Sequence, residues 1–188
     1  KLLWTSPEIK EARAIPAMVQ AIDDAGLAPR LWAFDEQAGS VSAALGDQAE
    51  NALLLRKWSP DLDIYGDVVF PSAADYASFY QAGYQAQPSQ LAAAATASLL
   101  ALKAATEGAG SLDGQAVRDA LSILDIDTFF GPIAFVLPPD QAGNGRPTGR
   151  NAGLVHVIAQ MQDGQAVPIW PRFLAQGNLR LPEAQPSN

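Results

Sequence analysis

The chain has 188 residues, of which 48% are hydrophobic, and a formal net charge of −8. This length and apolar content predict one domain, or two small ones, with a real buried core. The acidic balance and the scattered basic residues argue against nucleic-acid binding, because affinity for DNA and RNA comes mainly from Lys and Arg on phosphates. No run of about eighteen apolar residues is present, so no membrane insertion is expected. The absence of cysteine excludes disulfides and thiolate metal sites and suits the bacterial periplasm.

The first third of the chain alternates between short apolar strands and helices. Leu2-Leu3-Trp4 is typical of the end of a buried strand, and the Thr-Ser-Pro-Glu that follows is a helix-start signal. Apolar residues then recur at helical spacing up to Gly26, which is expected to end the helix. Strands are expected again at 30–34 and 51–58, with a short helix at 40–46 between them. This β-α-β-α-β order predicts a parallel sheet with helices on its faces.

Three helices and three short strands are expected in the rest of the chain. The helices are predicted at 72–84, 88–107 and 114–124, and the strands at 133–136, 154–160 and 166–170. Asp163-Gly164 is the turn signal for a hairpin between the last two strands. The segment 138–153 is rich in Gly, Pro and Asn and is expected to be an exposed loop. The tail after Trp170 is expected to be extended.

The packing faces of these helices follow from their spacing. The helix at 88–107 carries Leu91, Ala95, Leu99 and Leu102 on one face, where Ser98 is small enough for close helix packing. The helix at 114–124 is capped near Asp113 and is expected to bury three apolar residues, Val117, Leu121 and Leu124. After it, "TFFGPIAF" at 128–135 places a Gly-Pro break between apolar neighbours. The residues around this break are expected in the core: Phe129, Phe130, Ile133 and Phe135.

Several long stretches carry a family resemblance. Residues 88–135 read "PSQLAAAATASLLALKAATEGAGSLDGQAVRDALSILDIDTFFGPIAF", and 160–171 read "QMQDGQAVPIWP". Both resemble the C-terminal segment of type I periplasmic binding proteins, the solute receptors of ABC importers for branched-chain amino acids, amides, urea and aromatic acids. The stretch "ALGDQAENALLLRKWSPDL" at 44–62 resembles the same family's Gly-Asp-x-Ala-Glu-Gly stretch, with the strand and Trp-x-Pro loop that follow it.

Three departures from the family pattern stand out. Asn51 occupies a position where glycine is usual, which predicts a left-handed backbone conformation that Asn tolerates. Gln90 occupies a position where many members have Tyr next to the ligand cleft. The loop after Phe135 is longer and lacks the family's Phe-Asp pair.

The resemblance implies an α/β fold: a three-layer arrangement of a parallel sheet with flanking helices, within a two-lobe type I periplasmic-binding-protein fold. The chain matches only roughly the second half of the family, so we expect a fragment of both lobes. Residues 1–58 would be a second-lobe βαβαβ segment and 59–130 the crossover and helical segment of the first lobe. Residues 131–188 would supply returning strands, the hairpin and the tail. The missing N-terminal lobe is expected as a partner, in the same protein or another chain.

Ligands of open parallel sheets bind beyond the carboxyl ends of the strands. The residues at these ends, and hence the ligand-binding candidates, are Trp4, Thr5, Ser6, Phe34, Asp35 and Glu36. The two hydroxyls and the helix-start amides would hold a carboxylate or amide oxygen, and a carboxylate would pair with a ligand ammonium. The two aromatic rings would form an apolar wall. These residues also have interpretations without a ligand. Ser6 would be only a helix cap, Asp35 and Glu36 part of a solvated loop, and Trp4 part of the core.

The sequence offers little for catalysis, metal binding or cofactors. His156 is the only histidine and sits in an apolar strand, and no serine lies in a nucleophile motif. One histidine without cysteine makes a zinc site improbable, and the glycine-rich stretches do not match a phosphate loop or dinucleotide fingerprint. We therefore expect no metal and no cofactor. Helical spacing places three tyrosines on one side of a helix: Tyr76, Tyr80 and Tyr84. This stripe would belong to the core, to an interface or to the ligand cleft. Trp58 is a candidate for packing at the crossover between the lobes.

The leading hypothesis is a periplasmic solute receptor of an ABC importer. It would bind a small amino acid, amide or aromatic acid between two lobes by hinge closure, and deliver it to an ABC permease without chemical change. A ligand-sensing regulatory domain of the same fold is the alternative. An enzyme on an α/β sheet has less support, because no nucleophile and base are recognisable as a pair.

Overall fold

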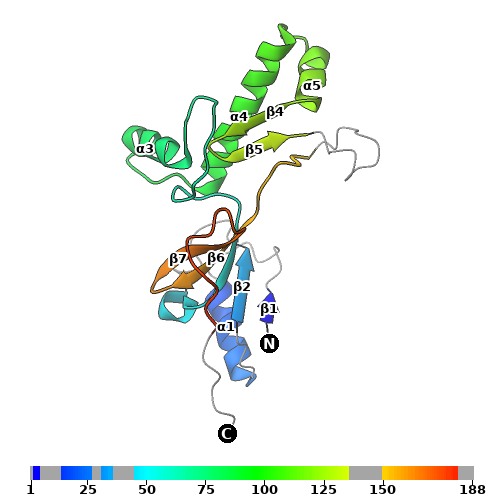
Figure 1. Ribbon diagram of the computed structural model, residues 1–188. Helices are drawn as coiled ribbons and strands as arrows, with labels where there is room; N and C mark the ends of the chain where they lie inside the picture. Colours follow the sequence, from blue (N-terminus) through cyan, green and yellow to red (C-terminus); the bar gives the residue numbers. More distant parts are fainter. Residues whose placement is uncertain (1, 5–13, 27–30, 36–44, 136–149, 182–188) are drawn as a thin grey trace. The chain divides into compact units, whose positions relative to one another are not determined.

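The computed structural model describes residues 2–4, 14–26, 31–35, 45–135 and 150–181. The chain divides into two compact units (Figure 1): unit 1 comprises Lys1–Arg56 and His156–Asn188, and unit 2 comprises Lys57–Val155. The assignment of chain segments to a first and a second lobe stays a prediction. Within the part of the chain that the structure describes, no helix combines the length and the apolar character needed to cross a membrane.

Unit 1 is built on a five-stranded mixed sheet in the order β1-β2-β3-β6-β7. The strands are β1 (Leu2–Trp4), β2 (Leu31–Asp35), β3 (Leu53–Arg56), β6 (Val157–Gln162) and β7 (Gln165–Trp170). The first three are parallel, as the alternation of strands and helices predicts. The predicted hairpin is confirmed: β6 and β7 pair antiparallel around Asp163 and Gly164, which both have positive φ. This hairpin extends the sheet by pairing β6 antiparallel with β3.

One face of this sheet is covered by helix α1 (Ala14–Asp24) and the short 3₁₀ helix η1 (Gly46–Ala49). The predicted end of α1 is confirmed, because Gly26 has a φ of +68° and its amide bonds back to Asp23. The predicted left-handed residue is also confirmed, since Asn51 has a φ of 66°. The core on this face contains Ile15, Val19, Phe34, Leu45, Ala49, Ala52, Leu54, Ala159 and Met161.

The C-terminal tail lies along the opposite face of the sheet through two buried glutamines. Side chains alternate along a strand, so Gln160 and Gln162 point away from the core side of β6. Gln160 bonds to the backbone N–H and C=O of Arg180, and Gln162 donates to the backbone C=O of Asn178. Leu53 pairs across the sheet with Gln160 and is only half-buried, so β3 is not buried equally on both faces.

The described residues of unit 2 form three helices and a two-stranded antiparallel sheet (Figure 1). The elements are α3 (Ala73–Tyr84), α4 (Gln90–Ala109), α5 (Gly114–Ser122), β4 (Asp125–Thr128) and β5 (Gly131–Ala134). The three predicted helices are confirmed. Each begins at a side-chain cap, because Ser72, Ser89 and Asp113 accept hydrogen bonds from amides of the first turn. Strand β4 was not expected from the sequence.

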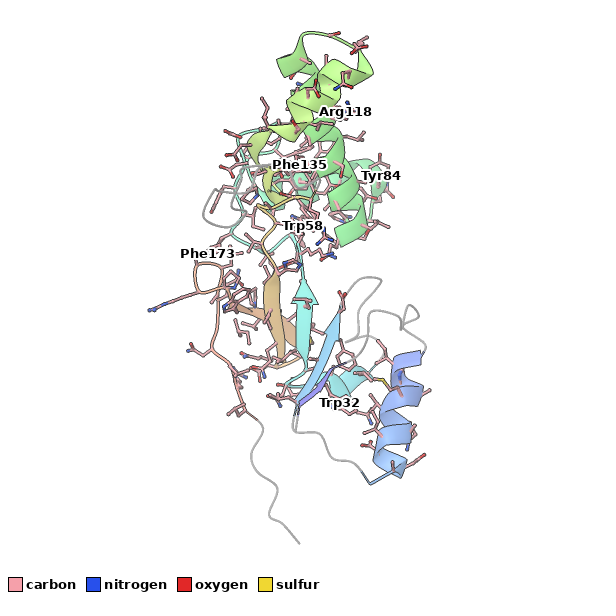
Figure 2. All side chains as sticks on the ribbon, turned by 90° about the vertical axis from the view of Figure 1, so that its right-hand side faces the viewer. Trp32, Trp58, Tyr84, Arg118, Phe135 and Phe173 are labelled. Atoms are coloured by element: carbon pink, nitrogen blue, oxygen red, sulfur yellow. The ribbon has the colours of Figure 1, made fainter. Side chains whose placement is uncertain are left out.

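The "TFFGPIAF" stretch contributes the last residue of β4, Thr128, and all of β5 to a hairpin that has the two phenylalanines at its tip. Thr128 pairs with Gly131, and the Thr128 hydroxyl donates to the Gly131 carbonyl and accepts from the Phe130 amide. Gly131 has a φ of +114°, a backbone conformation that residues other than glycine rarely adopt. Phe129 and Phe130 are buried, as predicted, and belong to an aromatic cluster of unit 2. The cluster consists of Trp58 (labelled in Figure 2), Phe70, Tyr76, Phe129 and Phe130.

Three packing expectations need correction. The face of α4 that carries Leu91, Leu99 and Leu102 is exposed; the helix instead buries the side with Ala97 and Leu100. Helix α5 contains no fully buried residue, and the apolar residues expected in its core, Val117, Leu121 and Leu124, are half-buried. Phe135 is half-buried too. Periodicity identifies an apolar side of a helix correctly, but it does not specify what covers that side.

Candidate ligand-binding site

The carboxyl ends of three parallel strands meet at one edge of the unit 1 sheet. In this register Trp4 pairs with Ala33 and Asp35 pairs with Leu55, so β1, β2 and β3 end there at Trp4, Asp35 and Arg56. The chain also leaves this edge for unit 2 after Arg56. It returns at the same edge, because Val157 at the start of β6 pairs with Arg56. Carboxyl ends of adjacent parallel strands are the usual location of ligand sites in open α/β sheets.

Three of the six candidate residues lie within the described part of the chain. Trp4 is the last residue of β1, and Phe34 and Asp35 are the last two of β2. Adjacent parallel strands thus bring these three residues to the same edge. Thr5, Ser6 and Glu36 lie outside the described residues. Their part in binding stays a prediction.

Phe34 is one of the largest fully buried side chains of the protein, with 1% of its surface exposed. It lies in the core beneath α1, and its ring stacks on Trp32 with the centroids 6.1 Å apart and the planes 11° from parallel. This packing fixes the end of β2 and thereby the backbone position of Asp35, which follows it and is half-buried. Contact of Phe34 with a ligand stays a prediction.

Arg56 is a candidate that the sequence analysis did not name. It is the last residue of β3 and is half-buried. It lies one position beyond Leu55, which pairs with Asp35. Neighbouring strands therefore end in side chains of opposite charge. The signal was present in the sequence, because the third strand of a βαβαβ unit ends at the same edge as the first two.

The chain beyond this edge is fixed by side chains of unit 2. The Gln90 side-chain oxygen accepts hydrogen bonds from the backbone amides of Lys57 and Trp58, at 2.7 and 3.2 Å. The Trp58 indole N–H donates to the Phe129 carbonyl at 3.0 Å, and the ring stacks on Phe130. Trp58 therefore packs within unit 2. Gln90 therefore holds the backbone that follows β3.

The other residues that the sequence analysis considered, three tyrosines and one histidine, differ in burial. Of the tyrosines spaced along α3, Tyr76 is buried in the aromatic cluster, where its hydroxyl bonds to Thr96 at 3.1 Å. Tyr80 is half-buried, and Tyr84 (labelled in Figure 2) is exposed. His156 is the first residue of the second segment of unit 1, immediately before β6, and it is exposed. Among the residues that the structure describes, no three His, Asp or Glu side chains gather in a way that could hold a metal ion.

Comparison with known proteins gives a consistent family. The family model described as periplasmic binding protein matches residues 11–157. A leucine binding protein from Thermotoga maritima superposes with a TM-score of 0.60 at 15% identity, covering 89% of this chain and 42% of that protein. A periplasmic binding protein from Burkholderia mallei gives 0.56 at 19% identity, covering 86% and 37%. A solute binding protein of an ABC transporter from R. palustris, in complex with benzoate, gives 0.54 at 11% identity, covering 85% and 47%.

These likenesses confirm the predicted α/β fold of the type I periplasmic-binding-protein kind. The sheet of unit 1 is mixed and not parallel throughout as expected, because β6 and β7 join it antiparallel. The chain spans less than half the length of the solved structures it matches. The family model, in contrast, covers most of the chain, from within the segment before α1 to the first residue of β6. The chain belongs to the periplasmic binding protein family.

Proposed function

We propose that the chain is part of a solute-binding receptor of an ABC importer, which binds a small amino acid, amide or aromatic acid in the periplasm and presents it to a membrane permease. The observation that carries this proposal is the family match over residues 11–157. Among the matched structures, one is a leucine binding protein and another was solved with benzoate. Leucine and benzoate both belong to the ligand classes that the sequence resemblance implies, which include branched-chain amino acids and aromatic acids.

The sheet edge supports a ligand of this kind. Asp35 and Arg56 end neighbouring strands, so a carboxylate and a guanidinium lie at one edge. Because Asp35 is in register with Leu55, the Asp35 and Arg56 side chains project from opposite faces of the sheet, so the Asp35 carboxylate is the group proposed to pair with a ligand ammonium. Trp4, Thr5, Ser6, Phe34 and Glu36 complete the proposed site. Binding involves no bond making or breaking, so the account requires no catalytic group and predicts no turnover.

A thermal shift screen of the protein from its full reading frame tests this proposal. A ligand at one hundred times its Kd stabilises the folded state by about 2.7 kcal/mol, which is several degrees in Tm. The panel consists of branched-chain amino acids, short amides, urea and benzoate. At least one class should raise the Tm. A flat response across the whole panel would remove the support for a receptor of these solutes.

The variant Asp35→Asn separates the ligand classes. Removing the carboxylate's charge should weaken the shift produced by amino acids, whose ammonium needs a negative partner, and leave the shift produced by benzoate unchanged. Asp125→Asn is the matched control, because Asp125 is an exposed carboxylate on β4 in unit 2. An equal response of both variants to amino acids would show that Asp35 does not contact the ammonium.

A further inference from the structure

Strand β7 lies at an edge of the five-stranded sheet, and the turn that follows it folds back onto that edge. The Pro168 carbonyl accepts hydrogen bonds from the backbone amides of Gln176 and Gly177, at 2.8 and 3.2 Å. Both amides lie outside the sheet, so this carbonyl points away from β6. Proline has no backbone N–H. At this position of the edge, the donor is therefore absent and the acceptor is already bonded within the chain.

The turn at 171–177, here called the edge cap, is fitted closely to β7. Leu174 anchors it, because this side chain is only 5% exposed and its amide donates to the Pro171 carbonyl at 2.9 Å. Gly177 permits the close approach, since a Cβ there would lie 2.7 Å from Cγ1 of Val167. Valine is stiff at χ1 and yields little. A side chain at position 177 would therefore displace the edge cap.

The sequence of β7 explains why its edge needs protection. An edge strand presents unpaired N–H and C=O groups that pair readily with a strand of another molecule, and charged side chains are a common safeguard. Strand β7 reads "QAVPIW" and contains no charged residue, while Val, Ile and Trp favour strands. Its protection depends on the backbone instead: on Pro168, on the register shift opposite Ile158 and Ala159, and on the edge cap.

Strand β5 in unit 2 shows the same combination of features. The Pro132 carbonyl accepts a hydrogen bond from the Asn151 side-chain nitrogen at 2.9 Å, and the Asn151 side-chain oxygen accepts from the Ala134 amide at 3.0 Å. A glycine again permits the approach, because a Cβ on Gly153 would lie 2.9 Å from the Pro132 Cβ. Two strands in separate units thus pair a proline with a returning segment that contains a glycine. This recurrence supports edge protection as the role of both segments.

We propose that the edge cap keeps the protein monomeric by preventing β7 from pairing with β7 of a second copy. Two identical antiparallel strands form a two-fold contact, so one strand supplies both halves of the interface. Backbone groups of alternate residues point outward along an edge strand, so Ala166 and Pro168 would make the contacts. Removing the cap frees the Pro168 carbonyl, and replacing Pro168 restores a donor. Protection of this edge is independent of the ligand and of the proposed receptor function.

Sedimentation velocity of the protein from its full reading frame, without ligand, tests the edge cap. Gly177→Val should displace the cap and cause reversible dimerisation, while the unchanged protein stays monomeric. Pro168→Val alone should also stay monomeric, because the cap still covers the edge. The double variant should dimerise about 30-fold more tightly than Gly177→Val, since a donor restored in each copy adds two hydrogen bonds. Gly83→Val is the matched control, because a Cβ on Gly83 meets nothing within 4 Å.

Ala166→Pro distinguishes edge pairing from unfolding. It removes an outward donor of β7 without removing a bond to β6, so adding it to Gly177→Val should restore the monomer. Association that persists with Ala166→Pro would belong to another surface or to unfolded protein and would overturn the proposal. A Gly177→Val protein that stays monomeric, with an unchanged far-ultraviolet circular dichroism spectrum, would overturn it too. Equal dimerisation of Pro168→Val and the double variant would show that the cap blocks nothing.

Discussion

Gln160 offers the sharpest test of how unit 1 holds its C-terminal tail. Its side-chain amide is fully buried and makes four hydrogen bonds. The oxygen accepts from the Arg180 amide and from the Gln162 side chain, both at 2.8 Å. The nitrogen donates to the carbonyls of Arg180 and Asn51, at 2.7 and 3.1 Å. Gln160→Leu removes all four bonds while keeping a side chain of similar size.

The expected effect follows from these bonds. A buried hydrogen bond contributes about 1 kcal/mol net to stability. Two of the four join Gln160 to the backbone of Arg180, so the variant should favour detachment of this part of the tail by about 2 kcal/mol, or about 30-fold. The bond from Gln162 to Asn178 remains, at 2.8 Å, so the preceding part of the tail should stay attached. The Asn51 carbonyl loses one partner.

Limited trypsin digestion measures this detachment. Cleavage after Arg180 requires the backbone there to leave the sheet, so its rate follows the population of the detached tail. Mass spectrometry of the released peptide should show about 30-fold faster cleavage in Gln160→Leu than in the unchanged chain. Gln165→Leu is the control, because Gln165 is exposed on β7. Cleavage at the same rate in Gln160→Leu and in the unchanged chain would refute the role assigned to this amide.

Three further predictions concern the stability of unit 2, each measured by urea unfolding with near-ultraviolet circular dichroism of the aromatic cluster. Gly66→Ala should destabilise by about 2 kcal/mol, because the new Cβ would lie 2.5 Å from the Thr128 carbonyl carbon; no loss would show that the hairpin moves freely. Val69→Asn should stabilise by about 1 kcal/mol, because Val69 has a φ of 63°; a destabilisation would contradict strain there. Ser89→Ala should cost about 1 kcal/mol by removing the bond from the Ala92 amide, and an unchanged midpoint would contradict the cap.

The local patterns of the sequence predict most of the secondary structure. The parallel strands and α1 follow from alternating apolar runs, and Asp163-Gly164 identifies the hairpin directly. Strand β4 was missed although it carries a period-two signal: Ile126 and Thr128 are more buried than Asp125 and Asp127 beside them. A strand of four residues beside a helix is too short for that signal to stand out.

Contacts between distant residues were not predictable in the same way. The bond from Gln160 to Arg180 joins residues twenty positions apart, and no periodic pattern links a buried glutamine to a tail backbone. The antiparallel pairing of β6 with β3 also depends on the whole sheet. Of the candidate site, strand order placed Trp4 and Asp35 at one edge correctly, while Arg56 was overlooked because only the first two strand ends were considered.

Titration calorimetry on the protein from its full reading frame tests the receptor account most directly. The account predicts saturable binding of one solute per protein for an amino acid, an amide or an aromatic acid, with the solute recovered chemically unchanged after prolonged incubation. Recovery of a converted solute would contradict the account and indicate an enzyme. Absence of binding across all three solute classes would contradict it as well.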